Sequence, residues 1–326
     1  MRIFVTGGAG YVGCVLVNEL LALGHIVTVL DLGVYGKDVL VPHDNLTIIW
    51  GDIRDQTLVA KSVPGHEVVI HLACISNDPS FDLNPELGKS VNLDCFPNLV
   101  EVARDSNVKK FIYASSSSVY GVKHVPNVDE DMDLEPLTDY SKFKADCERV
   151  LWEIAGDSDM CCTVLRPATV CGNSPRLRLD VVVNIFANLA FHKREISVFG
   201  GEQLRPNIHI LDMVRAYIIV LESEDYLIRN QVFNVGWDNL KVSEIAEIAK
   251  KLAPHPVDLA YVETDDIRSY HVSSDKIKHH LGFTPRYTVS DAIEGLYRTF
   301  DELGLTDTLD NDKYFNVKRM QKASLE

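Results

Sequence analysis

The chain has 326 residues, 46% of them hydrophobic and 24% charged, so it is long enough for one large core or two lobes and has the composition of a globular enzyme. Its formal net charge of −15, from 47 acidic and 32 basic residues, opposes general binding to nucleic acid or to anionic lipid. No apolar run reaches the roughly 20 residues of a membrane span, and a predicted strand begins directly after Met1, so we expect neither a membrane anchor nor a signal peptide.

The seven cysteines show neither a disulfide framework nor a metal-binding spacing. There is no C-x-x-C pair, the number is odd, and most of the cysteines lie inside apolar runs, where they are typical of small buried side chains. We therefore expect reduced thiols, no metal site and a cytoplasmic protein.

Apolar, β-branched runs alternate with helical patterns through the first half of the chain. Strands are predicted at 2–6, 26–30, 46–50, 67–72, 109–115 and 161–166, and helices at 11–23, 54–62, about 85–106 and 138–155. The strands are apolar on both faces, as in a parallel sheet that helices cover on both sides. The alternation predicts an α/β fold built on a doubly wound parallel sheet, the Rossmann arrangement.

The alternating pattern weakens after residue 172. Helices are predicted near 180–191, 242–252 and 290–303, and a strand at 231–235 is expected to return to the first domain. We expect a first domain over 1–172, joined by parts of 204–240, and a smaller, interleaved C-terminal lobe over 173–326.

A glycine-rich stretch, TGGAGYVG at 6–13, follows the first predicted strand and opens the first helix. Gly7 allows a tight turn, Gly10 lets a pyrophosphate approach the backbone, and Gly13 lets the helix pack close to the strand. The helix N-terminus then offers N–H groups to the phosphates. Asp31 ends the second strand, where its carboxylate suits two ribose hydroxyls and repels a 2′-phosphate. The pattern predicts bound NAD rather than NADP.

Asp52, in GDIRD, ends the third predicted strand. Two roles fit this position: a contact to the adenine, and the N-cap of the helix at 54–62. Both can hold, with Asp55 inside the first turn.

Tyr140 and Lys144 lie four residues apart, on one face of the predicted helix 138–155. A free tyrosine has a pKa of about 10 and is a poor base at neutral pH, but a neighbouring ammonium favours the phenolate. The serine run at 115–118 ends the fifth strand, at the carboxyl edge of the sheet where doubly wound folds bind ligands. Together these residues predict a site of proton transfer beside the cofactor.

With these motifs the chain resembles the extended short-chain dehydrogenases/reductases, specifically the NAD-dependent nucleotide-sugar epimerases and dehydratases. Nearly the whole chain takes part, since the resemblance also rests on HLAC at 71–74, SVN at 90–92, LRPATVCG at 165–172 and RPNIHILD at 205–212. It implies a catalytic triad of Ser116, Tyr140 and Lys144. In such a triad Tyr140 takes the proton of a sugar hydroxyl, Ser116 holds that oxygen, and Lys144 binds the nicotinamide ribose and tunes Tyr140.

The resemblance also implies ligand contacts and an oligomeric state. Expected NAD contacts are Gly7, Gly10, Tyr11, Val12, Asp31, Asp52, Ile53, Leu72, Ala73, Tyr140, Lys144 and Pro167. Expected nucleotide-diphosphosugar contacts are Asp78, Ser116, Ser117, Asn184, Arg205 and Arg268, with Arg176 and Arg178 as further candidates. Many relatives have Asp after the first of these arginines, whereas this chain has Pro206. Relatives form homodimers through the helices that correspond to 85–106 and 138–155, so we expect a homodimer.

The two residues after Ser116 bear on the reaction. Relatives that eliminate water carry an acid there, and relatives that epimerise C3 and C5 carry a cysteine at the second place, whereas this chain has Ser117 and Ser118. This favours hydride transfer at C4, in a 4-epimerase or a 4-oxidoreductase. A 4,6-dehydratase that takes its acid from another segment, such as Asp78, stays open, as does a reductase of a non-sugar alcohol or ketone.

Overall fold

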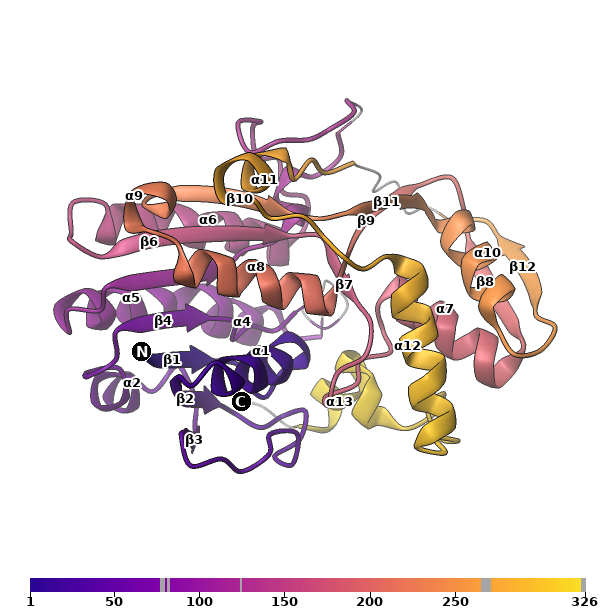
Figure 1. Cartoon of the computed structure of the whole chain (residues 1–326), viewed down its shortest axis with the longest axis horizontal. Coiled ribbons are helices and arrows are strands. Elements are labelled where there is room, and N and C mark those ends of the chain that lie inside the picture. Colours follow the sequence, from indigo (N-terminus) through magenta and orange to yellow (C-terminus); the bar gives the residue numbers. More distant parts are fainter. Residues whose placement is uncertain (77–79, 81–82, 124, 265–270, 324–326) are drawn as a thin grey trace.

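A seven-stranded parallel sheet dominates the computed structural model, which describes residues 1–76, 80, 83–123, 125–264 and 271–323. The strand order is β10-β6-β5-β4-β1-β2-β3 (Figure 1). The strands are β1 (Arg2–Thr6), β2 (Ile26–Asp31), β3 (Leu46–Trp50), β4 (Val68–His71), β5 (Lys110–Ala114), β6 (Cys161–Pro167) and β10 (Gln231–Val235). This is the doubly wound Rossmann fold that the sequence predicts, and the direction of winding reverses between β1 and β4.

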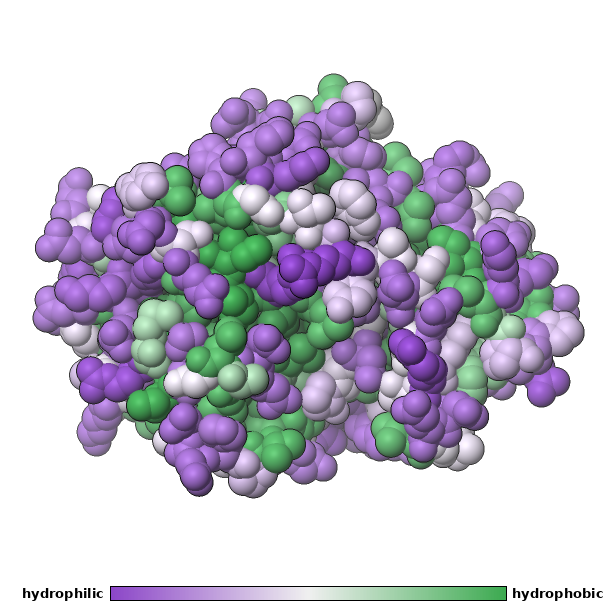
Figure 2. All heavy atoms as spheres, viewed as in Figure 1, coloured by the Kyte–Doolittle hydropathy of each residue, from purple (hydrophilic) through white to green (hydrophobic). Residues whose placement is uncertain are grey.

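Helices cover both faces of the sheet because the strands are apolar on both faces. In β1, Ile3 and Val5 belong to the core beneath α1 (Tyr11–Ala22) and α8 (Ile210–Glu222), while Phe4 points to the opposite core. That second core packs against α2 (Gln56–Ser62), α5 (Phe96–Asp105) and α6 (Asp139–Ala155). On the face shown in Figure 2, apolar side chains gather over α1 and α8, where Ile218 and Ile219 are half-buried.

The helix predicted over 85–106 is broken into three pieces. These are α4 (Pro85–Lys89), a π-helical turn (Ser90–Asp94) and α5. Pro97 has no N–H to continue the ladder of the preceding turn. The Asn92 side chain turns inward, where its Oδ1 accepts from the Ile75 N–H at 2.8 Å and its Nδ2 donates to the Ile75 carbonyl at 3.0 Å. At this break, the two hydrogen bonds of Asn92 fix Ile75 in the segment that follows β4.

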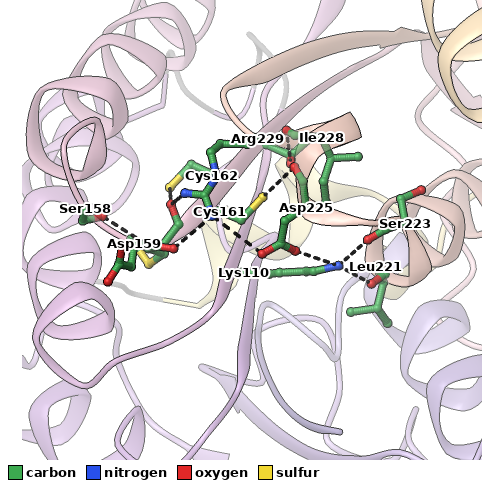
Figure 3. Close-up of polar contacts among 12 residues, drawn as sticks. Lys110, Ser158, Asp159, Cys161, Cys162, Leu221, Ser223, Asp225, Ile228 and Arg229 are labelled. Atoms are coloured by element: carbon green, nitrogen blue, oxygen red, sulfur yellow. Dashed lines mark hydrogen bonds and ion pairs between the residues drawn. The ribbon is translucent and has the colours of Figure 1, made fainter.

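The segment from α8 to β10 returns to the large sheet, and α9 (Asp225–Ile228) lies within it. Figure 3 shows its attachment: Lys110 Nζ, at the start of β5, donates to the carbonyl oxygens of Leu221 at 3.0 Å and Ser223 at 2.6 Å. Arg229 donates to the Asp159 carbonyl at 3.2 Å, and β10 then pairs in parallel with β6. These contacts lie at the amino ends of the strands, so they leave the carboxyl ends free for a site.

The smaller lobe is built around a two-stranded parallel sheet of β8 (Glu195–Phe199) and β12 (Asp258–Val262). Its core also takes in α7 (Val182–Asn188), α10 (Val242–Leu252) and α12 (Val289–Glu302). A three-stranded sheet of β7 (Thr169–Cys171), β9 (Leu204–His209) and β11 (Asp238–Lys241) lies between the two parts. The remaining elements are a π-helical turn (Leu189–Lys193), α11 (Asp275–Leu281), 3-10 turns (Ser117–Tyr120 and Asp312–Tyr314) and α13 (Asn316–Lys322).

All seven cysteines are free thiols, and Cys74 is the one that is not buried. Within the described ranges, none of the helices has the length and apolar character needed to cross a bilayer. The same residues contain no cluster of three or more His, Cys, Asp or Glu side chains placed to hold a metal ion.

Candidate functional site

A cavity of about 430 Å³ lies at the carboxyl ends of the strands of the large sheet. Its walls come from the segments that follow β1, β2, β4 and β5, from the start of α6, and from loops of the smaller lobe. The strand order reverses between β1 and β4. The segments that follow these two strands therefore run to opposite sides of the sheet and open a crevice between them.

The glycine loop closes tightly against the end of β4. Gly7 has φ of +73°, and a Cβ on it would lie 2.6 Å from the Ala73 nitrogen. A Cβ on Gly13 would meet the Gly7 carbonyl oxygen, so α1 packs directly on the loop. A Cβ on Gly10, by contrast, would meet only one atom within 4 Å. The first turn of α1 therefore faces the cavity with bare backbone, which fits the diphosphate of a dinucleotide.

Asp31 is held at the end of β2 by two backbone amides. Its Oδ2 accepts from the Ala9 N–H at 2.9 Å and its Oδ1 accepts from the Gly33 N–H at 2.8 Å. Burial raises the pKa of this carboxyl group, while the two amides oppose that rise. Each oxygen keeps a further lone pair, so the fixed carboxylate can accept hydrogen bonds from both hydroxyls of a ribose.

Asp52, expected at the adenine, is not among the residues that line the cavity. Arg54 holds its carboxylate, with Nε and Nη2 donating to Oδ2 at 2.9 and 2.6 Å. Burial opposes ionisation of Asp52, but the hydrogen bonds from Arg54 outweigh it and lower the pKa. Nor is it the N-cap: Asp55 caps α2 by accepting from the Leu58 N–H at 3.0 Å. The neighbouring Ile53 lines the cavity.

The three residues of the expected triad, Ser116, Tyr140 and Lys144, all line the same cavity. A capping box formed by Thr138 and Ser141 starts α6, which puts Tyr140 in the first helical turn and Lys144 one turn further on. Lys144 is only 4% exposed, and its Nζ donates to the Ala114 carbonyl at 2.6 Å. The same Nζ lies 5.9 Å from the centre of the Tyr140 ring. The ammonium is therefore anchored to the end of β5 beside the tyrosine.

The serine run adopts a short 3-10 turn with Ser116 as its cap. Ser116 Oγ accepts from the Ser118 N–H at 3.1 Å and lies 2.8 Å from the Ser118 hydroxyl. Ser117 also lines the cavity. The turn thus presents hydroxyl groups, and no carboxylate, next to the triad.

A buried ion pair supports this turn from behind. Glu148 of α6 receives two hydrogen bonds from Arg166 of β6, at 3.0 and 2.6 Å, and a third from the Ser115 hydroxyl. Arg166 also donates to the Tyr120 hydroxyl at 2.7 Å. The network ties α6, β6 and the end of β5 together, and so fixes the relative positions of the triad residues.

Asn184, expected to bind the substrate, does not line the cavity. Its side chain is fully buried, with Oδ1 accepting from the Gly172 N–H at 3.0 Å and Nδ2 donating to the Arg178 carbonyl at 2.7 Å. Tyr11, which lines the cavity, joins this cluster by donating its hydroxyl to the Gly172 carbonyl at 2.6 Å. Asn184 therefore shapes the loop after β7, and the structure does not bring its side chain to the cavity wall.

The structure brings most of the other expected residues together. The expected cofactor residues that line the cavity are Gly7, Gly10, Tyr11, Val12, Asp31, Ile53, Leu72, Ala73, Tyr140, Lys144 and Pro167. The expected substrate residues that line it are Ser116, Ser117 and Arg205, joined by Arg176 and Arg178. Asp78 and Arg268 lie outside the described residues.

The C-terminal segment contributes lining residues that the sequence analysis missed. Asn316 and Met320 of α13 line the cavity. Asn316 Nδ2 donates to the Ser76 hydroxyl at 2.9 Å across a separation of 240 residues. No local pattern in the sequence signals a contact over such a distance.

The comparisons with known proteins agree with this geometry. The sequence model of the NAD-dependent epimerase/dehydratase family matches residues 3–236. The chain is 29% identical over 304 residues to UDP-glucose 4-epimerase of Corynebacterium glutamicum, covering 88% of this chain and 92% of the relative. It is 28% identical over 321 residues to dTDP-glucose 4,6-dehydratase of Streptomyces niveus, covering 90% of each.

A solved structure is similar over almost the full chain. The crystal structure of UDP-glucose 4-epimerase from Thermotoga maritima with UDP-glucose matches with a TM-score of 0.83 at 27% identity, covering 94% of this chain and 100% of that one. The family model matches well over half of the 326 residues, and the glycine loop and Asp31 line the cavity. The chain therefore belongs to the NAD-dependent epimerase/dehydratase family and is an NAD-dependent enzyme.

Proposed function

We propose that this enzyme transfers hydride at C4 of a nucleotide-diphosphate sugar and acts as a 4-epimerase. The main support for this proposal is the scarcity of acidic side chains among the described residues that line the cavity. Among the described residues that line it, Asp31 is the only acid, and the amides of Ala9 and Gly33 hold it on the cofactor side. Ser117 and Ser118 stand where elimination of water needs an acid, and a serine hydroxyl alone is a poor acid or base near neutral pH.

The proposed mechanism uses the three triad residues around O4 of the sugar. The Tyr140 oxygen takes the proton of the 4-hydroxyl, and the Lys144 ammonium beside it favours the phenolate form. The Ser116 hydroxyl donates a hydrogen bond to O4 and keeps it next to Tyr140. Bound NAD supplies the acceptor for the C4 hydride and the donor that returns it. Once the 4-keto sugar has turned over in the cavity, Tyr140 would give the proton back to O4, and the C4 configuration would be inverted.

Arginine side chains support an anionic substrate. The chain carries a net charge of −15, so its overall field repels a nucleoside diphosphate, and local donors must hold it. Arg205, on β9, lines the cavity from the smaller lobe. Guanidinium binds phosphate oxygens through two N–H groups, and we assign Arg205 to the substrate diphosphate.

Turnover in D2O tests the reaction. The enzyme is incubated with a panel of UDP-, dTDP-, GDP- and CDP-sugars, and the products are analysed by NMR. We predict inversion at C4 with no deuterium incorporated into carbon, because hydride leaves and returns to the same carbon without exchange with solvent. Loss of water with solvent deuterium at C5 would identify a 4,6-dehydratase. Accumulation of NADH together with a 4-ketone would identify a net oxidoreductase.

We further propose a cytoplasmic homodimer, in line with the family resemblance. The seven free thiols suit a reducing compartment. The helices that relatives use for dimerisation correspond to α4, α5 and α6, and contacts join α5 and α6 to each other and α4 to α6 on one face of the sheet (Figure 1). Light scattering on the purified protein should give the mass of two chains, and the mass of one chain would refute the dimer.

A further inference from the structure

Arg176 is a buried cation whose partners carry no negative charge. It is 3% exposed, its guanidinium carbon lies 4.2 Å from the centre of the Tyr35 ring, and its Nη2 donates to Asn316 Oδ1. Its Nε has no hydrogen-bond partner within the part of the chain that the structure describes. A buried charge that keeps an unused donor is costly unless a ligand completes its bonds.

A second cation makes the charge imbalance larger. Arg178 lies beside Arg176 and pairs with Asp180, with an Nε–Oδ1 distance of 2.5 Å. Burial, and next the repulsion from Arg178, lower the pKa of Arg176 to about 10. Both arginines line the cavity, and Nη2 of Arg178 also lacks a partner among the described residues. Two cations set against one carboxylate therefore leave a positive charge that faces the cavity.

The position of Arg176 identifies the anion. Tyr35, on which the guanidinium stacks, lies four residues beyond Asp31, on the segment expected to hold the adenosine ribose. Two residues before Arg176, the Ser174 hydroxyl donates to the Tyr11 carbonyl at 2.7 Å, so this loop lies against the first turn of α1. The cation thus stands between the end of β2 and the glycine loop, on the cofactor side of the cavity.

The C-terminal helix holds this arrangement closed. Asn316 accepts from Arg176, donates through Nδ2 to the Ser76 hydroxyl at 2.9 Å, and donates through its backbone N–H to Asp180 at 2.5 Å. One turn further on, Arg319 donates to the Val34 carbonyl. The helix α13 therefore links the segments that follow β2 and β4 to the loop of the smaller lobe.

We propose that Arg176 binds the diphosphate of NAD, and that Asn316 positions its guanidinium so that the C-terminal helix retains the cofactor. The proposal assigns Arg176 to the cofactor and not to the sugar nucleotide. We assign the diphosphate of the sugar nucleotide to Arg205. It rests on the cofactor of the family and not on the reaction at C4.

Exchange of NAD from the holoenzyme tests the proposal. The full-length protein with bound NAD is mixed with excess isotopically labelled NAD, and exchange is followed by mass spectrometry. Arg176→Gln removes the charge and should accelerate exchange about tenfold or more, the range for loss of a charge-assisted hydrogen bond. Arg176→Lys keeps the charge without the planar fork and should give an intermediate rate, and Asn316→Ala should also accelerate exchange. Lys322→Gln, an equal charge change at an exposed position of α13, should leave the rate unchanged.

Binding of UDP to the same variants, measured by calorimetry, completes the test. We expect its affinity to stay at the wild-type value. Weaker UDP binding with unchanged NAD exchange would overturn the proposal, because Arg176 would then serve the substrate. Unchanged values for both ligands, with only a lower unfolding temperature, would also overturn it and leave Arg176 a structural role.

If Arg176→Gln does not fold, the other two variants decide. NAD exchange at the wild-type rate in both Arg176→Lys and Asn316→Ala would then overturn the proposal. A wild-type enzyme that retains NAD but inverts no sugar would refute only the proposed reaction.

Discussion

His71, at the end of β4, is a histidine that the fold keeps neutral. It is 2% exposed, lies 2.7 Å from the Thr6 hydroxyl through Nδ1, and stacks on Tyr113 with ring centres 5.7 Å apart. Burial, and next the charge of Lys144, lower its pKa from the ordinary 6.5 to about 3. This environment suits a packing role beneath the cavity and not proton transfer.

The lowered pKa of His71 predicts a pH dependence of stability. Between about pH 6.5 and pH 3 the unfolded chain binds a proton at this position and the folded chain does not, so the free energy of unfolding falls as the pH falls. One such group contributes at most about 1.4 kcal/mol per pH unit. The free energy of unfolding is measured by urea denaturation near pH 7 and near pH 5. Between these two pH values it should fall less for His71→Gln than for the wild type. Equal pH dependence for the two proteins would mean that His71 binds protons equally in the folded and unfolded states, and would contradict the lowered pKa.

Residues with a local sequence pattern were the predictable ones. The glycine loop and Asp31 lie at fixed distances from predicted strands, and both line the cavity. Asp52 pairs with Arg54, two residues away, and does not line the cavity. Sequence spacing does not show which partner a carboxylate takes. Asn316 went unnoticed because its contacts come from the far end of the chain.

At the level of elements, the helix α6 carries both Tyr140 and Lys144 of the proposed triad and Glu148, one member of a buried ion pair. Glu148 is one turn beyond Lys144 and is 3% exposed, and its partner Arg166 is 5% exposed. Loss of one member of a buried pair leaves the other charge without compensation, which is strongly destabilising.

Two substitutions on α6 separate this pair from surface charge. We predict that Glu148→Gln lowers the free energy of unfolding by about 3 kcal/mol, because Arg166 then stays buried without a counter-ion. Glu153→Gln removes one of two carboxylates that pair with Arg149 on the solvent side of the same helix and should cause no measurable change. Chemical denaturation measures both. Similar small effects for the two variants would show that the buried network does not fix α6.

The strands of the large sheet were predictable to within about two residues, since buried parallel strands are continuous apolar runs. The helix α8 was not predicted. Its sequence, ILDMVRAYIIVLE, is rich in β-branched residues, and apolar residues also occupy its less buried positions, such as Leu211, Ile218 and Ile219. The break after α4 was missed because it depends on the inward-turned Asn92, which is a tertiary contact.

At the level of the whole molecule, a strongly acidic protein concentrates positive charge where two lobes meet. Arg176, Arg178 and Arg205 line a cavity whose only acid within the described residues is Asp31. The segments after the strands of the large sheet and the helix α6 supply the glycine loop and the proposed triad. The loop after β7 supplies Arg176 and Arg178, and β9 supplies Arg205. The two diphosphates that we propose to bind here, one of the cofactor and one of the substrate, would account for this distribution of charge.

Turnover of Tyr140→Phe tests the central claim most directly, with bound NAD measured in the same preparation. The substitution removes one hydroxyl from the first turn of α6 and leaves the glycine loop, Asp31 and Arg176 unchanged. We predict that NAD content stays at the wild-type level while C4 inversion falls by about 10²-fold to 10⁴-fold or more, as expected for loss of the proton-transfer group. A variant that inverts C4 within about tenfold of the wild-type rate would contradict this account.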